Sequence, residues 1–179
     1  LSDSPPEKDV QWSEQGMVSS YKFIQKLWNM HNQIKKKILN EQNHHLDEDL
    51  EKYTNNFIAK ITNNLEKFNY NVIVANMYET YNYLINFIKD KQDLKNLEEN
   101  YKKILVCFLP VIPHFSSECL SDLNTNEEIK WPDYDKSILD NEEVKFVVQI
   151  NGRKRAILNV KKDISENELL KLAKDNNII

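Results

Sequence analysis

The chain is poor in the residues that build phosphate loops and metal sites. Its 179 residues include only two glycines, Gly16 and Gly152, so a glycine-rich loop around a phosphate could hardly be built. The two cysteines, Cys107 and Cys119, match no zinc-ligand spacing, and their apolar neighbours favour buried free thiols in a reducing compartment. The sequence has no apolar run of the roughly 20 residues that cross a bilayer and no signal peptide at its start, so we expect a cytoplasmic chain without membrane contact.

Clusters of side chains that could support catalysis are also scarce. Glu41 and His44 have the Glu-x-x-His spacing of di-iron bundles, but that chemistry needs a second copy and two more carboxylates. A di-iron enzyme remains an alternative that bound metal would reveal. His45 lies in a polar stretch, which favours a solvated role. His114 follows a proline, which favours a capping or packing role, and His31 lies among apolar residues, which favours a core role. We therefore expect no catalytic centre, no metal and no cofactor in this chain.

Charge is unevenly distributed along the sequence. The net charge of −4 argues against a basic nucleic-acid binder as a whole. However, Tyr21–Asn40 contains five lysines and no acid, and Val144–Lys162 contains six cations and no acid. Residues 104–143 carry nine acids and only two lysines. Only local patches could bind a polyanion, and such binding should weaken steeply with salt.

Hydrophobic periodicity predicts four long helices, over about 13–38, 46–68, 71–89 and 93–108. Ser13 is the expected N-cap of the first helix. The expected inward face of that helix is Met17, Tyr21, Ile24, Trp28, His31, Ile34 and Ile38. Helices of this length joined by short polar loops favour an antiparallel bundle.

Two prolines and a turn dipeptide mark the boundaries of elements in the rest of the chain. Pro110 and Pro113 end the fourth helix, and a short helix should follow from Pro113 to about residue 123. Apolar residues alternate from Val144 to Ile150, and Asn151-Gly152 suits the type I′ turn of a hairpin. Ser165, with Glu168 three residues later, forms the capping box of a last helix that ends near Lys174.

The predicted fold is therefore mainly α, with three parts. Residues 1–124 form the helical bundle, residues 125–143 an acidic irregular linker, and residues 144–179 an incomplete α/β unit of a hairpin and a helix. An isolated two-stranded hairpin is marginal in water. We expect this one to pack on the bundle or to pair with a second molecule through its open edge.

Two sets of cations are candidates for binding phosphate. Arg153 and Arg155 are the only arginines against 22 lysines, and they lie at the tip of the hairpin. The guanidinium fork suits phosphate better than an ammonium does, although a charged tip that protects a strand edge from aggregation is the plainer interpretation. Lys22 and Lys26 lie one helical turn apart, near Asn29, and three more lysines at 35–37 extend the charge. They form either a solvated helix face or a track for a phosphate backbone.

The order of the segments resembles the C-terminal part of bacterial-type leucyl-tRNA synthetases, which are class I aminoacyl-tRNA synthetases. The segments are SPPEKDVQWSEQG, YKFIQKLW, IAKITNNLEKFNYNVIVANMYETYNYL, LPVIPHFSSECL, WPDYD and VVQINGRKR. The helical segments also fit the related valyl and isoleucyl enzymes, whereas the first and last segments are specific to the leucyl family. The resemblance covers essentially the whole chain.

That resemblance implies a function in tRNA handling. The family attaches leucine to tRNA(Leu) with ATP and Mg, and the catalytic and editing domains of such a parent are absent from these 179 residues, which also lack an initiator Met. The bundle then corresponds to the anticodon-binding domain, with tRNA(Leu) and the catalytic domain of the parent chain as partners. A helical protein-interaction scaffold is the alternative from another class.

The resemblance also implies the tRNA-binding residues. The expected set is Lys22, Lys26, Asn151, Arg153, Lys154 and Arg155. Lys22 and Lys26 match basic positions of the family's first helix, and the hairpin residues match its Asn-Gly-Lys-x-Arg turn. Gln25, Asn55 and Asn56 stand where relatives often have basic residues, which implies fewer phosphate contacts here.

Overall fold

The structure, a computed structural model, describes Lys8 and seven stretches of the chain. The stretches are residues 13–39, 48–90, 96–124, 128–139, 143–150, 153–161 and 164–175. The chain divides into two compact units, Leu1–Tyr134 and Asp135–Ile179. The three-part division expected from the sequence stays a prediction.

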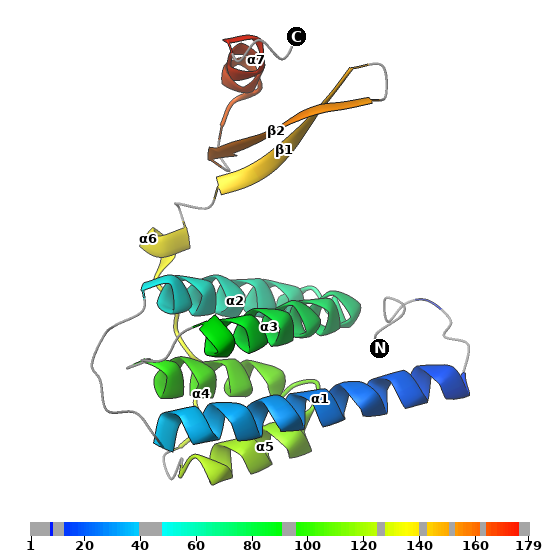
Figure 1. Cartoon of the computed structure of the whole chain (residues 1–179), viewed down its shortest axis with the longest axis vertical. Helices are drawn as coiled ribbons and strands as arrows, with labels where there is room; N and C mark the ends of the chain where they lie inside the picture. Colours follow the sequence, from blue (N-terminus) through cyan, green and yellow to red (C-terminus); the bar gives the residue numbers. More distant parts are fainter. Residues whose placement is uncertain are drawn as a thin grey trace. The chain divides into compact units, whose positions relative to one another are not determined.

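The first unit is a bundle of helices. These are α1 (Glu14–Leu39), α2 (Glu48–Glu66), α3 (Tyr70–Asp90), α4 (Leu97–Phe108) and α5 (Pro113–Asp122). Consecutive helices run in opposite directions, so α1 and α3 run parallel as neighbours (Figure 1). The expected antiparallel bundle is confirmed, and the C-terminal ends of α1 and α3 lie at the same end of it.

The helix ends follow the expected chemistry. The backbone N–H of Gly16 donates to Ser13 Oγ at 3.1 Å, which confirms Ser13 as the N-cap of α1. Acidic residues occupy the first turn of α2, where the helix dipole favours negative charge. Pro113 begins α5, where its missing N–H removes no helical hydrogen bond.

The bundle core lies between α4 and the helices around it. The buried residues of α4 are Leu97, Asn100, Tyr101, Ile104, Leu105, Cys107 and Phe108. Phe108 meets Phe57 of α2 edge to face, with ring centroids 5.9 Å apart. Each fully buried Leu, Ile or Phe side chain contributes about 1.5–3 kcal/mol to folding. This core accounts for the stability of helices that are otherwise rich in Asn and Lys.

The inward face predicted for α1 is partly wrong. Tyr21 is 65% exposed, and Met17 and Trp28 are also exposed. His31 and Ile34 are buried as predicted, and the other buried residues of α1 are Phe23, Leu27 and Met30. α1 carries two adjacent apolar stripes, and spacing alone does not decide between them. Packing against α3 and α5 selects the stripe that contains Leu27.

A buried histidine joins three helices of the bundle. His31 of α1 is 0% exposed, with Nε2 3.3 Å from Asp122 Oδ2 at the end of α5 and Nδ1 3.2 Å from the Tyr101 hydroxyl of α4. A carboxylate only accepts, so Nε2 carries the proton and Nδ1 accepts from Tyr101. Lys35 Nζ also lies 3.1 Å from Asp122 Oδ2. These bonds confirm the core role expected for His31.

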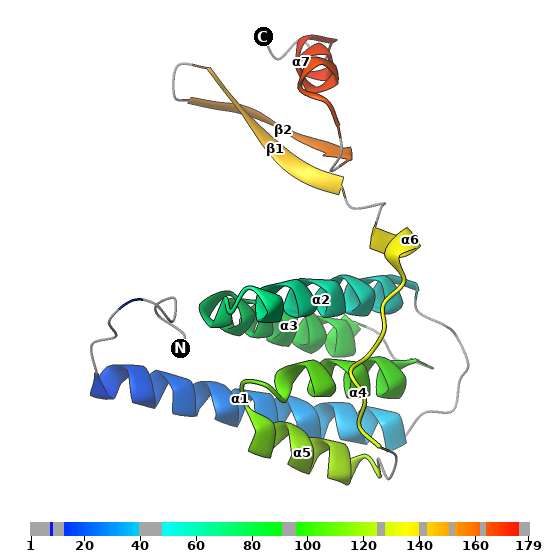
Figure 2. The same ribbon diagram turned by 180° about the vertical axis from the view of Figure 1, so that it is seen from behind.

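The connector after α5 lies along the bundle. Residues 128–134 pass over α4 on the way from α5 to α2 (Figure 2). The indole N–H of Trp131 donates to Thr62 Oγ1 of α2 at 3.0 Å, and Tyr134 packs against the core. Part of the segment expected to be an irregular linker is therefore attached to the bundle by specific contacts.

The second unit contains the hairpin and two helices. A short helix that the sequence did not predict, α6 (Lys136–Leu139), precedes the strands β1 (Glu143–Ile150) and β2 (Arg153–Lys161), and α7 (Glu166–Asp175) follows them. The strands pair antiparallel, with Ile150 opposite Arg153. In the described residues the sheet has these two strands. Asn151 and Gly152 lie outside the described residues.

The capping box of α7 is confirmed in both directions. The Glu168 carboxylate accepts from the backbone N–H of Ser165 at 3.2 Å, and the backbone N–H of Glu168 lies 3.4 Å from Ser165 Oγ. The Ser165 hydroxyl also donates to the Glu168 carboxylate, which lowers the pKa of Glu168. None of the helices that the structure describes is both long enough and apolar enough to cross a membrane.

The state of His31 predicts a pH dependence of stability. Burial lowers the pKa of His31 below 6.5, and the bond to Asp122 only partly offsets this. The unfolded chain therefore takes up this proton more readily, and the stability from neutral His31 is complete above about pH 6.5 and falls below it. We expect the free energy of unfolding in urea to drop between pH 7.5 and 5.5, with a slope of at most about 1.4 kcal/mol per pH unit from this group.

A His31→Gln variant cannot titrate at this position and should lose much of that slope. His114→Gln is the matched control because His114 is exposed at the start of α5, and it should keep the slope. Equal slopes in the wild type and His31→Gln would contradict the prediction.

Candidate nucleic-acid interface

One face of α1 is polar, basic and free of acids. Lys22, Lys26, Asn29, Gln33 and Lys37 follow steps of three and four residues, so they form one line along the helix, which we call the α1 track. The first four are exposed. At about 1.5 Å per residue the track is roughly 22 Å long. The positions predicted for Lys22 and Lys26 therefore share one solvent-facing line, as phosphate binding requires.

The track ends at a hollow between α1 and α3. Gln33, Lys36 and Lys37 line it from α1, and Ile88 and Lys89 line it from α3. Its volume is about 270 Å³. We call this site the lysine hollow. Sequence analysis missed Lys89, although parallel neighbours in an up-and-down bundle bring the ends of α1 and α3 together.

The opposite ends of α1 and α3 enclose a different surface. A hollow of about 490 Å³ is lined by Ser13, Gln15, Gly16, Ser19, Ser20, Asn71, Val74, Ala75 and Tyr78. Tyr78 stacks on Phe23 with ring centroids 3.6 Å apart, and its side chain remains partly exposed. This end offers hydroxyl and amide groups but no lysine.

The hairpin presents Arg155 through an irregularity in the ladder. Val148 pairs with Ala156 and Gln149 pairs with Lys154, so the ladder skips Arg155. A residue left out in this way is a β-bulge, which bends the strand and redirects a side chain. Arg155 is exposed. Arg153 and Lys154 lie in β2, whereas the predicted contact Asn151 is outside the described residues.

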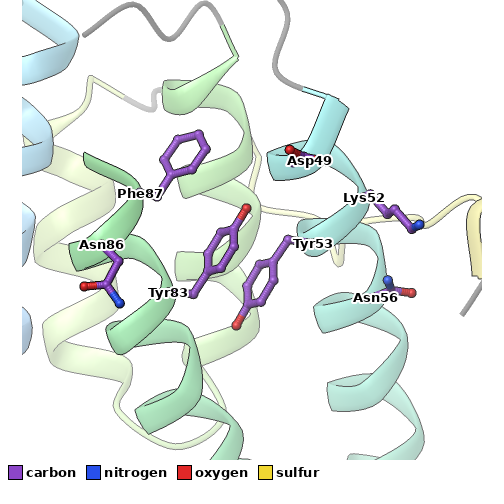
Figure 3. Close-up of a pocket in the computed structure, with 7 residues that line it drawn as sticks. All are labelled: Asp49, Lys52, Tyr53, Asn56, Tyr83, Asn86 and Phe87. Atoms are coloured by element: carbon purple, nitrogen blue, oxygen red, sulfur yellow. The ribbon is translucent and has the colours of Figure 1, made fainter. Parts of the chain in front are cut away.

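The hollow shown in Figure 3 lies between α2 and α3, away from the α1 track. Its volume is about 520 Å³, and it is lined by Asp49, Lys52, Tyr53, Asn56, Tyr83, Asn86 and Phe87. Tyr53 and Tyr83 face each other, with centroids 3.6 Å apart and rings 3° from parallel. The first turn of α2 adds Glu48 and Glu51 beside Asp49. These acids disfavour a polyanion, so this pocket is not part of the interface.

Amides replace basic residues on other parts of the bundle. Gln25 is exposed on α1, and the side-chain amide of Asn55 donates to the Glu51 carbonyl at 2.9 Å. Asn56 lines the hollow of Figure 3, where its Oδ1 is buried without a hydrogen-bond partner among the described residues. None of these three side chains adds positive charge to the bundle surface.

The described residues with reactive side chains include two buried cysteines and an exposed histidine. Burial raises the pKa of both Cys107 and Cys119 to about 12, so these thiols stay protonated near neutral pH. His114 is exposed at the start of α5. Across the described ranges no group of three or more His, Cys, Asp or Glu side chains could hold a metal ion. The Glu41–His44 pair lies outside those ranges.

The fold is shared with a solved synthetase structure. The LeuRS chain of the Agrobacterium radiobacter K84 agnB2 LeuRS–tRNA–LeuAMS ternary complex aligns with 92% of this chain at a TM-score of 0.66. The match covers 22% of that chain, at 17% sequence identity. The helical bundle and its small α/β extension thus form an architecture found within a tRNA synthetase.

The sequence itself shows the family. Residues 47–170 match the family described as the anticodon-binding domain of tRNA ligase, and the chain belongs to this family. Leucine–tRNA ligases of Thermosipho melanesiensis, Orientia tsutsugamushi and Petrotoga mobilis are 34%, 33% and 32% identical to it over 97%, 94% and 93% of its length. The chain spans only about a fifth of the length of these relatives, 20–22%.

The hydrogen bond between Tyr53 and Thr80 predicts a stability effect. Tyr53 Oη lies 3.0 Å from Thr80 Oγ1, and Thr80 is fully buried. Tyr53→Phe leaves that hydroxyl without its bond, so we expect a loss of about 1–2 kcal/mol in the free energy of unfolding. Urea denaturation would measure it. Tyr21→Phe is the control, since Tyr21 is largely exposed, and an equal loss in both variants would contradict the assignment.

Proposed function

We propose that this chain binds tRNA and positions it for a leucine–tRNA ligase, without carrying a catalytic centre of its own. The parent enzyme would attach leucine to tRNA(Leu) with ATP and Mg in the cytoplasm. The family match and the leucine–tRNA ligase relatives support this proposal. The partners would be tRNA(Leu) and the catalytic domain of the same parent.

The observation that carries the proposal is the acid-free, exposed side of α1. The whole chain has a net charge of −4, yet α1, the longest helix among the described residues, has five lysines and no acid from Tyr21 to Leu39. Phosphates are attracted by such a local patch even on an acidic protein. Lys22 and Lys26 supply the charge, and Asn29 and Gln33 supply hydrogen-bond donors between the lysines.

The hairpin adds a second kind of contact. Arg155 offers five donors in a planar fork, which suits a phosphate or an unpaired base. The bulge takes Arg155 out of the strand ladder, so its backbone is not part of the regular pairing. We include Asn151, Arg153 and Lys154 in the same contact surface. Edge pairing of the hairpin between two molecules also remains a proposal.

One observation favours a different function, a helical scaffold for protein partners. Met17, Val18 and Tyr21 are all at least half exposed at the start of α1. Exposed apolar groups of this kind mark protein contacts when they form a continuous patch. A protein contact there would respond weakly to salt, whereas a phosphate contact loses affinity steeply with salt.

Direct binding to tRNA tests the proposal. Fluorescence anisotropy with labelled tRNA(Leu) should show binding at about 50 mM salt that weakens strongly by about 200 mM. Lys22→Gln with Lys26→Gln should weaken binding roughly tenfold and reduce the salt slope by about 1–2. Lys102→Gln with Lys103→Gln removes the same charge from α4, where each lysine pairs with a glutamate, and should have little effect.

Absence of binding at low salt would overturn the proposal, and equal losses in the two double variants would remove the α1 track from it.

The hairpin is tested best in a complete leucine–tRNA ligase that contains this chain. Arg153→Ala with Arg155→Ala should raise KM for tRNA about threefold to tenfold and leave leucine activation unchanged, because only tRNA contacts are lost. The control is Lys145→Ala with Lys161→Ala, which removes two cations from the other end of the hairpin. Unchanged tRNA kinetics in the arginine variant would exclude the hairpin from tRNA binding.

A further inference from the structure

The lysine hollow combines residues that the sequence keeps about fifty positions apart. Lys36 and Lys37 come from the last turn of α1, and Lys89 comes from the last turn of α3. Lys36 and Lys89 are both exposed, and neither forms an ion pair with a described side chain. Two cations from different helices therefore face one small hollow.

We propose that the lysine hollow is a binding site for one backbone phosphate of an RNA strand that follows the α1 track. The inference rests on the proposed function and adds a specific contact to it. Lys36 and Lys89 bind the phosphate from two sides, and the Gln33 amide donates to it. Lys37 completes the wall of the site.

Size and polarity of the hollow fit this ligand. A water molecule takes about 30 Å³ of liquid volume, so a hollow of about 270 Å³ has room for a phosphate group and several waters. Ile88, which is buried, forms an apolar part of the lining. An apolar wall reduces solvent around the bound charges and strengthens their attraction. The hollow should therefore attract a phosphate more strongly than a single exposed lysine does.

Lysines in the last turn of a helix also offset the negative end of its dipole. Such an interaction with the dipole needs only one helix, so it does not explain why lysines of two helices line the same hollow. Here the ends of α1 and α3 meet, so Lys36 and Lys89 line one hollow of about 270 Å³, which is comparable in width to the screening length of about 8 Å at physiological salt. Their mutual repulsion is relieved when an anion binds between them. The hollow therefore favours an anion despite the nearby helix ends.

Continuity with the α1 track identifies the source of the phosphate. Gln33 and Lys37 belong to both the track and the hollow. A strand with a rise of about 3.4 Å per nucleotide would cover the 22 Å track with roughly six nucleotides. A phosphate at the hollow then lies in line with phosphates near Lys22 and Lys26. A free phosphate ion would gain nothing from this alignment.

The test compares matched double variants of this chain in the tRNA anisotropy assay. Lys36→Gln with Lys89→Gln should weaken binding about tenfold at about 50 mM salt and reduce the salt slope by about 1–2. The control Lys102→Gln with Lys103→Gln should change it less than twofold. Thermal unfolding of each variant verifies that the bundle is intact.

If tRNA affinity falls in Lys22→Gln with Lys26→Gln but not in Lys36→Gln with Lys89→Gln, the proposed function still holds and the phosphate site at the lysine hollow is overturned. Equal losses in the control would also overturn it, because general charge would then explain the effect. Failure of the wild type to bind tRNA would overturn both.

A second measurement separates an RNA phosphate from a free ion. In an NMR titration, a short single-stranded RNA should shift the backbone amides of Ile88 and Lys89 at concentrations where inorganic phosphate does not. Equal shifts with RNA and with inorganic phosphate at the same concentration would contradict the proposal, and so would the absence of any shift with RNA.

Discussion

The rotation of α1 about its own axis decides which of its residues meet solvent, and the buried His31 fixes that rotation. His31 bonds to Tyr101 of α4 and to Asp122 of α5, so one edge of α1 faces two other helices. Lys35 reinforces the same edge through Asp122. With that edge held, Lys22 and Lys26 must point outward. The basic surface thus depends on a polar contact inside the bundle.

Most of the bundle could be predicted because its signals are local. Ser13, the prolines around α5 and the pair Ser165–Glu168 each define a helix end by a bond or steric rule within a few residues. The helix predicted over 93–108 was likewise found, as α4 from Leu97 to Phe108. α1 has two stripes, and its contacts with α3, α4 and α5 determine which is buried. Spacing in one helix contains no information about that choice.

The candidate interface shows the same limit. Lys22 and Lys26 could be recognised as one face because they lie a single turn apart. Lys89 could not be recognised from the sequence as part of the site, because it lies near Lys36 only through the parallel arrangement of α1 and α3. The pocket that Tyr53 and Tyr83 line was missed for the same reason, since it forms only when α2 and α3 pack. Periodicity identifies the faces of single helices, while sites shared by two helices need the arrangement of the bundle.

The β-bulge at Arg155 has a consequence for how firmly the two strands are aligned. A regular hairpin can slide by one residue, and such a slip moves every side chain to the opposite side of the ribbon. The extra residue breaks the two-residue alternation, so a slipped alignment could not accommodate it at the same place. In a ribbon with only two strands in the described residues, this irregularity favours a single pairing register of β1 and β2.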